Sequence, residues 1–419
     1  LGASALYPRA YSDAQIRAGA AATWLQNGLA VAFGLVLLAG LGTVRLGWLG
    51  AVQLILVAQG YVRAWPAAGK TQVMSAGADW LTYESMARDI VQHGWLLNGP
   101  ASGGQEHTPL YYQAFYSYFL AGLHLMTGDG LGGVIFAQYV LLAATAAFMY
   151  LLGRELFGPR AGAVGLLLFL WFEQKYLLQY SDLLLSENLV YPLLSGGFYL
   201  LVRQLRTKAW RDVAGAGLLL GMAAATRSTV VAFLPAVVAA PLTQRRWKAA
   251  AVLAPLMMAA LCLLGIRNVI VAGQFHITSS AGWGDLLDAH PIPAAVHLDV
   301  PRDRSHAKDL LLAYARQYPI QLAKRVVGGG LLYVIDVPGR WSWREAARHL
   351  DLMALWLLWL ASFFTLRRGV LSPRIALIHI FIAEQLLIAL LYQDQGYGLR
   401  VALPAYLFPV SYTHLTLPT

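Results

Sequence analysis

Long apolar stretches separated by short polar segments repeat along most of this chain. A helix needs about 20 mostly apolar residues to cross the hydrocarbon core of a bilayer, so this pattern predicts an all-α, polytopic membrane protein. Several stretches are shorter than that, and we expect their helices to extend into the flanking residues. The predicted spans, about 11 by this criterion, cover residues 24–41, 46–62, 131–152, 161–172, 189–202, 213–225, 230–240, 249–266, 350–366, 375–392 and a last one that starts at 401.

The composition agrees with this class. Of 419 residues, 58% belong to the hydrophobic set and only 12% are charged, and the mean hydropathy is +0.55. These values exclude an intrinsically disordered chain, a collagen and a secreted disulfide scaffold. The single cysteine, Cys262, lies inside an apolar stretch, which leaves no intramolecular disulfide and no cysteine metal site.

The charge pattern predicts an orientation. The net charge is +10, but the excess is divided among short loops, so we expect no nucleic-acid partner. Short cytoplasmic loops are enriched in Lys and Arg, which predicts that the loops at 154–160, 203–211, 245–248 and 367–374 are cytoplasmic. Most acidic residues then fall on the other side, where we expect a site built from several loops. Alternation assigns to that external side the segments 63–130, 173–188, 226–229, 267–349 and 393–400.

The two ends of the chain need separate treatment. Residue 1 is Leu, and we expect the natural start to lie upstream. Residues 410–419, VSYTHLTLPT, break the apolar pattern and resemble a translated sequencing adapter, so we expect them not to be native and the natural chain to continue past residue 409. The rest, 1–409, is predicted to be a single polytopic membrane domain with a first external loop at 63–130 and a large external loop at 267–349.

The first external loop contains an amphipathic pattern. Apolar residues after Asp79 recur at helical spacing, which predicts a helix that begins near Asp79 and lies along the membrane surface. Asp79 would then stand at the N-terminal edge, where a carboxylate can simply cap the helix. The apolar positions are Tyr83, Met86, Ala87, Ile90 and Val91.

Several segments resemble one known family. Asp79, Tyr83 and Ala87, followed by Gly94, the PLYY element at 109–112 and Gly128, resemble the first external loop of the C-type membrane glycosyltransferases. This superfamily includes the protein O-mannosyltransferases and the lipid A aminoarabinose transferase. Three later segments resemble it in the expected order, so the resemblance covers roughly residues 79–409. These segments are GIRNVIVAGQFHITSSAG at 265–282, AYARQYP at 313–319 and YGLRVALP at 397–404.

One departure from the family pattern concerns the first acidic position. Many relatives have Asp-Glu where this chain has Asp79-Trp80. The change weakens a paired-carboxylate or metal role and leaves Asp79 as the single candidate. We expect no firmly bound cofactor, and the sequence leaves a divalent cation open.

The resemblance implies an inverting glycosyltransferase. In that family a hydroxyl of an acceptor attacks the anomeric carbon of a sugar carried on polyprenyl phosphate, on the extracytoplasmic face of the membrane. This chemistry needs a base for the hydroxyl, cations for the departing phosphate and a groove for the lipid. Asp79 is the candidate base, because partial desolvation at the bilayer surface makes a carboxylate a better proton acceptor. The expected location is the bacterial inner membrane, with the site facing the periplasm or exterior.

Cationic residues near the predicted outer ends of spans are candidates for the phosphate. A guanidinium at membrane depth is costly and marks a function or a partner, although snorkelling to lipid headgroups is an equal alternative for each residue alone. The candidates are Arg227, Arg267, Arg400 and Lys175.

Other residues complete the substrate-binding set. Tyr111 and Tyr112 could stack on a sugar, although anchoring in the interfacial aromatic belt is the more common role. Asp182 and Glu187 resemble acidic positions of the family's second external loop, where they would pair with Lys175 or Arg227, bind a metal or cap the next helix. Glu84 is also included, although it projects from a different face of the helix than Asp79.

Two other classes of function remain as alternatives. One is an oligosaccharide ligase or polymerase that uses polyprenyl-diphosphate glycans, but such enzymes lack the first loop that begins with an acidic residue. The other is a multispan transporter or flippase, for which broken helices and a repeat between the two halves are expected. The sugar, hexosyl or pentosyl, and the acceptor, a lipid, glycan or protein, cannot be read from the residues.

Overall fold

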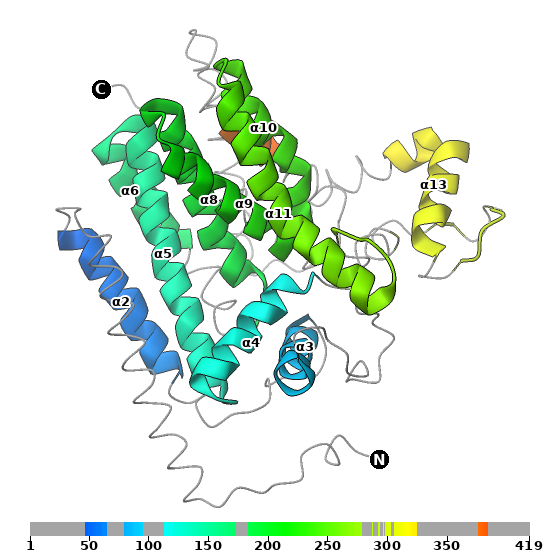
Figure 1. The fold of residues 1–419 in the computed structure, drawn as a ribbon, viewed down its shortest axis with the longest axis horizontal. Helices are drawn as coiled ribbons and strands as arrows, with labels where there is room; N and C mark the ends of the chain where they lie inside the picture. The colour runs from blue at the N-terminus through cyan, green and yellow to red at the C-terminus, as the bar shows by residue number, and fades with distance from the viewer. Residues whose placement is uncertain are drawn as a thin grey trace, which may run out of the picture. The chain divides into compact units, whose positions relative to one another are not determined.

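The computed structural model describes residues 47–64, 79–94, 113–172, 183–278, 306–324 and 376–383, with single positions between 287 and 302. In this part of the chain every regular element is a helix (Figure 1), which confirms the all-α prediction there. The helices are α2 (Gly47–Ala64), α3 (Asp79–His93), α4 (Phe115–Thr127), α5 (Leu131–Phe157), α6 (Pro159–Phe172), α8 (Glu187–Thr207), α9 (Trp210–Thr226), η4 (Ser228–Phe233), α10 (Leu234–Thr243), α11 (Trp247–Ala272) and α13 (Ala307–Gln317).

The predicted spans coincide with helices wherever the structure describes them. The span at 189–202 lies within α8 and the span at 249–266 within α11, and both helices extend past the apolar residues at each end. In the described part, two helices are long and apolar enough to cross a bilayer, judged by length and composition alone: Leu131–Phe157 and Trp247–Val271. The total of about 11 spans therefore stays a prediction, and the spans at 24–41, at 350–366 and from 401 lie outside the described residues.

The chain divides into two compact units, and α5 and α8 each contribute to both. Unit 1 is Leu1–Gln105, Tyr116–Ala147 and Gln174–Pro192; unit 2 is Glu106–Phe115, Phe148–Glu173 and Leu193–Thr419. The expectation of one membrane domain over residues 1–409 stays a prediction.

Unit 1 is held together by close helix contacts. A Cβ atom at Gly60 of α2 would lie 2.4 Å from the Cβ atom of Tyr139 in α5, so only glycine allows these helices to approach so closely. At the start of α5, Gly133 meets Thr127 in the same way. Gly128, with φ +82°, makes the turn that joins α4 to α5. These contacts fix α2 and α4 against the first half of α5.

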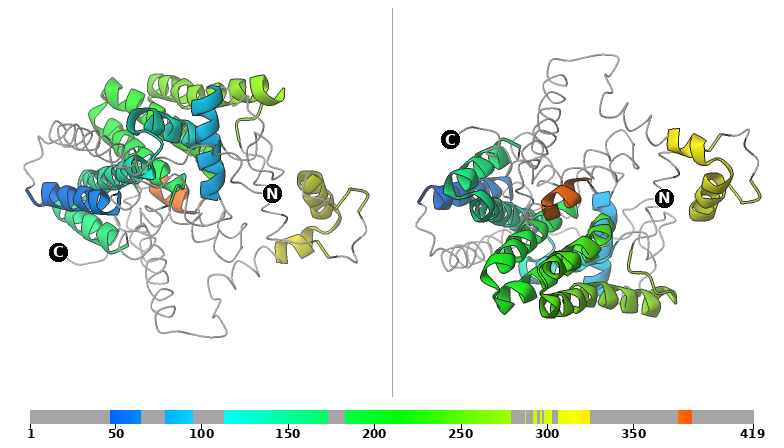
Figure 2. Two further views of the ribbon diagram at one scale, coloured as in Figure 1. Left: turned by 90° about the horizontal axis from the view of Figure 1, so that it is seen from below. Right: turned by 90° about the horizontal axis from the view of Figure 1, so that it is seen from above.

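Unit 2 contains three consecutive helices that run up, down and up. Gly217 of α9 faces Leu253 and Leu256 of α11, and Gly221 faces Met257, so the residue numbers rise together and α9 and α11 are parallel. The intervening α10 contacts α11 and joins it through a short turn, so α10 is antiparallel to both. Figures 1 and 2 show the three helices side by side.

An aromatic cluster forms part of the core of unit 2. Phe198 of α8, Phe233 of η4 and Phe381 of the helical segment 376–383 are each at most 1% exposed. Their ring centroids lie 4.9 to 5.2 Å apart, the spacing of interacting aromatic pairs. The predicted span at 375–392 therefore packs, where it is described, between residues from two other predicted spans.

Loops that share a predicted side gather at one end of unit 2. Arg206 in the last turn of α8 forms an ion pair with Glu155, which joins the end of α8 to the end of α5. Arg246 donates through Nη1 to the backbone oxygen of Gln204 at 2.8 Å, which joins the loop after α10 to the same place. Three of the four loops that the charge pattern assigns to the cytoplasm thus lie together, as a common side requires, and the fourth, 367–374, lies outside the described residues.

Candidate active site

The helix that carries Asp79 forms as predicted. α3 begins at Asp79, and Tyr83, Ala87 and Ile90 are 6%, 0% and 3% exposed, so the apolar stripe faces the protein. Asp79 stands one turn before Tyr83, in the same row of the helix. Helix N-termini in general favour a negative charge.

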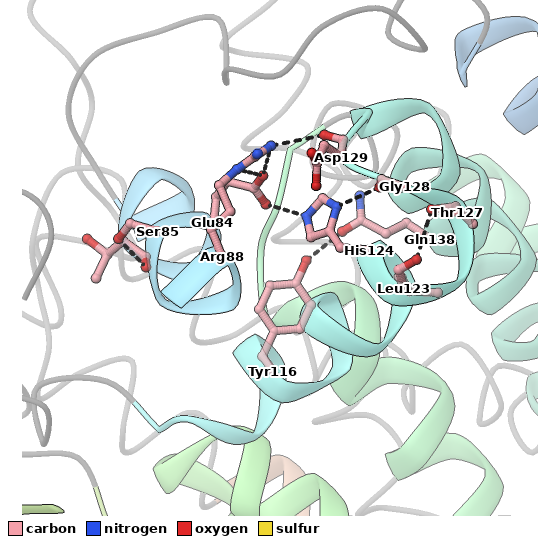
Figure 3. Close-up of polar contacts among 11 residues, drawn as sticks. Glu84, Ser85, Arg88, Tyr116, Leu123, His124, Thr127, Gly128, Asp129 and Gln138 are labelled. Atoms are coloured by element: carbon pink, nitrogen blue, oxygen red, sulfur yellow. Dashed lines mark hydrogen bonds and ion pairs between the residues drawn. The ribbon is translucent and has the colours of Figure 1, made fainter. Parts of the chain in front are cut away.

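A buried ion pair that sequence reasoning missed fastens α3 to α4. The side chains of Glu84 and His124 are 4% and 2% exposed, and Oε2 of Glu84 lies 3.0 Å from Nε2 of His124 (Figure 3). The other ring nitrogen of His124, Nδ1, lies 3.1 Å from the backbone oxygen of Gly128. The carbonyl of Gly128 only accepts, so Nδ1 donates to it. When Glu84 is ionised, Nε2 donates to Glu84 as well, and the pair consists of an imidazolium and a carboxylate.

The pKa shifts agree with this assignment. Burial raises the pKa of Glu84, but the hydrogen bond and charge of His124, together with Arg88, outweigh burial, so the net pKa is lowered. Burial lowers the pKa of His124, but the hydrogen bond and charge of Glu84 outweigh it, so the net pKa is raised. Each partner therefore stabilises the charged form of the other.

Arg88 completes the cluster. Its Nε atom donates to Oε1 of Glu84 at 2.7 Å, one turn earlier on α3. Its Nη2 atom donates to the backbone oxygen of Asp129 at 3.0 Å, in the turn between α4 and α5. Both oxygens of Glu84 are thus engaged, and α3 is fixed to α4 and to the turn that follows it (Figure 3).

A second polar chain lies beside this cluster in unit 1. Tyr116, which is 0% exposed, donates to Oε1 of Gln138 at 2.6 Å, and Asn188 donates to the same oxygen at 2.8 Å. The ring of Tyr83 meets the ring of Tyr116 edge-on, with centroids 5.0 Å apart. Burial, with the neighbouring Tyr83 and Glu187, raises the pKa of Tyr116, so its hydroxyl remains a donor at every relevant pH.

Glu187 directly precedes Asn188, the last member of this second chain. It is 0% exposed, it begins α8, and its Oε2 atom accepts a hydrogen bond from Ser186 at 3.2 Å. Its place in the first turn agrees with the helix-start role among the three that the sequence left open. Asp182, predicted to act with it, lies outside the described residues.

Two predicted arginines lie at one end of unit 2. Arg227 occupies the break between α9 and η4, in an extended conformation with φ −144° and ψ 120°. Arg267 stands near the end of α11, is 6% exposed, and donates to Oδ1 of Asn268 at 2.8 Å. Because α9 and α11 are parallel, Arg227 and Arg267 are at the same end, opposite to the basic loops.

Gln113 joins two predicted external segments and the end of a predicted span at this end of unit 2. Its Nε2 atom lies 3.0 Å from the backbone oxygen of Ala224, near the end of α9, and 3.3 Å from that of Ile277, after α11. Gln113 is 5% exposed, and within the described residues its Oε1 atom has no hydrogen-bond partner. The sequence offered one signal for it, since it directly follows the PLYY element.

The other predicted site residues lie at the edge of the described part of the chain or outside it. For Asp79 the structure describes only the helical backbone, and the other positions lie outside the described residues. Within the described part of the chain no group of three or more His, Cys, Asp and Glu side chains is arranged to hold a metal. The residues outside the described part are Tyr111, Tyr112, Lys175, Asp182 and Arg400.

Residues 109–271 match the family of dolichyl-phosphate-mannose-protein mannosyltransferases. The match confirms the resemblance to the C-type membrane glycosyltransferases and supports a membrane location. It covers under half of the chain. Gln113, His124, Arg227 and Arg267 lie within it, and Asp79 lies before it. No curated protein matches the chain significantly.

Solved structures give weaker likenesses. AglB, an oligosaccharyltransferase from Archaeoglobus fulgidus solved with an inhibitory peptide and a dolichol-phosphate, is 12% identical, with a TM-score of 0.44 over 87% of this chain and 50% of its own. ArnT from Cupriavidus metallidurans, in its structure bound to undecaprenyl phosphate, is 14% identical to this chain, with a TM-score of 0.41. The match covers 89% of this chain and 77% of ArnT. The apo structure of ArnT gives 14% identity and a TM-score of 0.38, and the match covers 86% of this chain and 76% of ArnT. The chain thus spans half the length of AglB.

Proposed function

We propose that this protein is an inverting, C-type glycosyltransferase that moves a sugar from a polyprenyl-phosphate donor to a hydroxyl of a lipid, glycan or protein. The observation that carries the proposal is the gathering of Gln113, Arg227 and Arg267 at one end of unit 2, within the residues that match the mannosyltransferase family. We place this end at the outer face of the bacterial inner membrane, because the basic loops occupy the opposite end.

The two arginines supply the cations that the reaction requires. Arg267 is 6% exposed in a helix long and apolar enough to cross a bilayer, a position where a charge carries a large desolvation cost. A guanidinium matches the oxygens of a phosphate through paired hydrogen bonds. As the sugar leaves, the phosphate gains negative charge, and cations aimed at it lower the barrier.

Asp79 is proposed to act as the base. The acceptor hydroxyl transfers its proton to the Asp79 carboxylate while its oxygen forms a bond to the anomeric carbon. The bond from that carbon to the phosphate oxygen breaks on the opposite face, and its electron pair stays with the phosphate. The configuration at the anomeric carbon is therefore inverted.

Glu84 receives a different role from the one that the sequence suggested. Both of its oxygens are engaged by His124 and Arg88, so we propose that it positions α3, and hence Asp79, without touching the sugar. Further substrate contacts are proposed for residues of the predicted external segments: Tyr111, Tyr112, Lys175, Asp182, Glu187 and Arg400.

Sugar transfer by membranes that contain the protein tests the proposal. A panel of hexosyl and pentosyl polyprenyl phosphates is offered to the unmutated protein and to Asp79→Asn, and loss of a general base should lower transfer by at least ~100-fold. Asp309→Asn, which makes the same change at an exposed position in the first turn of α13, is the control and should transfer normally. Full activity of Asp79→Asn would remove the base, whereas no transfer by the unmutated protein from any donor would reject the class.

A further inference from the structure

A pocket at the basic end of unit 2 has no place in the proposed reaction. It has a volume of about 450 Å³ and lies between the ends of α8 and α10 and the starts of α9 and α11. This end is opposite to Arg227 and Arg267. The side chains that define its chemistry are Lys208, Trp210, Arg245, Arg246, Trp247 and Lys248.

The pocket is strongly cationic. Four of its lining residues carry a positive charge and none is acidic. Two carboxylates at this end of unit 2 belong to other interactions: Asp212 is 2% exposed and its Oδ2 atom lies 3.4 Å from Nε of Arg203, and Glu155 pairs with Arg206. A concave site lined by one sign of charge concentrates ions of the opposite sign, so the expected ligand is an anion.

Two of the cations stand at strained backbone positions. Lys208 has φ +61° and Arg245 φ +56°, and they are the only non-glycine residues with positive φ in the described part of the chain. Each directly follows a turn that ends a helix, where glycine is the usual residue. Lys208 and Arg245 make the fold less stable than glycine at the same positions would, and both line the same pocket.

Two helix N-termini add partial positive charge. α9 begins at Trp210 and α11 at Trp247, and the residues before them, Ala209 and Arg246, provide no side-chain cap. The N–H groups of Asp212 and Ala249 already bond to the backbone oxygens of these two residues, but no side-chain cap competes with a ligand at either helix start. Helix N-termini of this kind bind phosphate readily when cations stand beside them.

The two tryptophans indicate where the anion comes from. Trp210 and Trp247 are 55% and 64% exposed, and the Nζ atom of Lys248 lies 5.5 Å from the ring centroid of Trp247. Exposed tryptophans beside cations are typical of the membrane–water interface. We propose that this pocket binds the phosphate headgroup of an anionic phospholipid from the leaflet opposite to the sugar-transfer site.

The strained positions provide a variant that should fold. Lys208→Gly with Arg245→Gly removes two cations and gives each backbone position the residue that it favours. Arg154→Gln with Arg160→Gln is the matched control, since it removes the same charge from exposed residues at the same end of unit 2 that do not line the pocket. Thermal unfolding of the three purified proteins should show that neither variant is less stable than the unmutated protein.

Native mass spectrometry of the full chain in detergent, titrated with phosphatidylglycerol or phosphatidylcholine, measures the binding. We expect one phosphatidylglycerol to bind the unmutated protein and the control alike, and the glycine variant to bind it at least about tenfold more weakly, which corresponds to roughly 1.4 kcal/mol. The proposal would be overturned if the glycine variant bound phosphatidylglycerol as tightly as the unmutated protein does. It would also be overturned if the unmutated protein bound phosphatidylcholine as tightly as phosphatidylglycerol. Inorganic phosphate at millimolar concentration forms the last arm, and full displacement of the lipid by it would show a site for free phosphate and reject the lipid.

Discussion

Nε2 of His124 lies 3.0 Å from Oε2 of Glu84, and this contact between α4 and α3 holds the helix that begins at Asp79. The two residues are 40 positions apart in the chain. Because both side chains are buried, neither charge can be left alone without a large cost. The position of the proposed base therefore depends on a contact that lies more than one helical turn away from it.

We predict that removing one partner of this pair destabilises the protein strongly. His124→Ala leaves the buried carboxylate of Glu84 without its imidazolium, a change that costs about 3–5 kcal/mol in comparable pairs. Unfolding in denaturant measures it, and a double-mutant cycle with Glu84→Gln isolates the pairwise part. Additive losses in the two single variants would show that the pair has no coupling.

The same pair predicts a pH dependence of stability. The pKa of Glu84 is lowered from an ordinary value of 4.5, so its contribution is complete above pH 4.5 and is lost as the pH falls through the lowered pKa. The pKa of His124 is raised from 6.5, so its contribution is complete below pH 6.5 and is lost as the pH rises through the raised pKa. The pair thus stabilises the fold most between pH 4.5 and 6.5. Unfolding midpoints across pH should show this maximum, and it should flatten in the double variant Glu84→Gln with His124→Gln.

Gln113 provides a prediction for the end of unit 2 that carries Arg227 and Arg267. Gln113→Leu removes both hydrogen bonds, to Ala224 near the end of α9 and to Ile277 after α11. Each is worth about 0.5–1.5 kcal/mol, so their loss should loosen the end that carries the two arginines. We expect a higher KM for the donor and a modest loss of stability. Gln317→Leu, at an exposed position of α13, is the control, and an unchanged KM in Gln113→Leu would contradict the role.

The positive charge of Arg267, at the same end of unit 2, provides a direct test of the proposed phosphate contact. Arg267→Gln removes a proposed phosphate cation and should lower kcat/KM by about 10²-fold, the loss typical of one electrostatic group in a reaction centre. Arg267→Lys keeps the charge but loses the paired geometry, so it should recover only part of the rate. Donor-dependence curves for both variants measure this, and wild-type rates in Arg267→Gln would remove the residue from the site.

Close helix packing yields a prediction about stability. A Cβ atom at Gly221 would lie 2.7 Å from the backbone oxygen of Met257, so Gly221→Ala must push α9 and α11 apart at a cost of about 1–3 kcal/mol. At Gly122 of α4 a Cβ atom meets nothing within 4 Å. Gly122→Ala should therefore be neutral, or stabilising by up to about 1 kcal/mol. Thermal unfolding of the two variants side by side checks both outcomes.

The helices could be predicted from the sequence because their signals are local. The apolar stripe of Tyr83, Ala87 and Ile90 fixes a helix whatever it packs against, and the structure begins that helix at Asp79. Apolar length in the same way anticipated α5 and α11.

The polar contacts could not be predicted in this way. Glu84 was expected to face away from Asp79 and to bind substrate, and nothing near it in sequence identifies His124 as its partner. Gln113 follows the PLYY element, but no sequence pattern predicts its partners. Only the fold shows that it bonds to Ala224 near the end of α9 and to Ile277 after α11. The basic loops were interpreted one by one, and only the return of α10 brings Lys208 beside Arg245.

The parallel arrangement of α9 and α11 has a mechanical consequence. α11 has 26 residues and is therefore about 39 Å long, somewhat longer than the ~30 Å hydrocarbon core of a bilayer. One end of this helix, which contains Pro255, carries Arg267, and the other borders the cationic pocket for which we propose a lipid headgroup. With the pocket bound to a lipid of one leaflet, the thickness of the bilayer determines whether Arg227 and Arg267 reach the phosphates of the opposite leaflet. Sugar transfer should therefore vary with the acyl-chain length of the surrounding lipids.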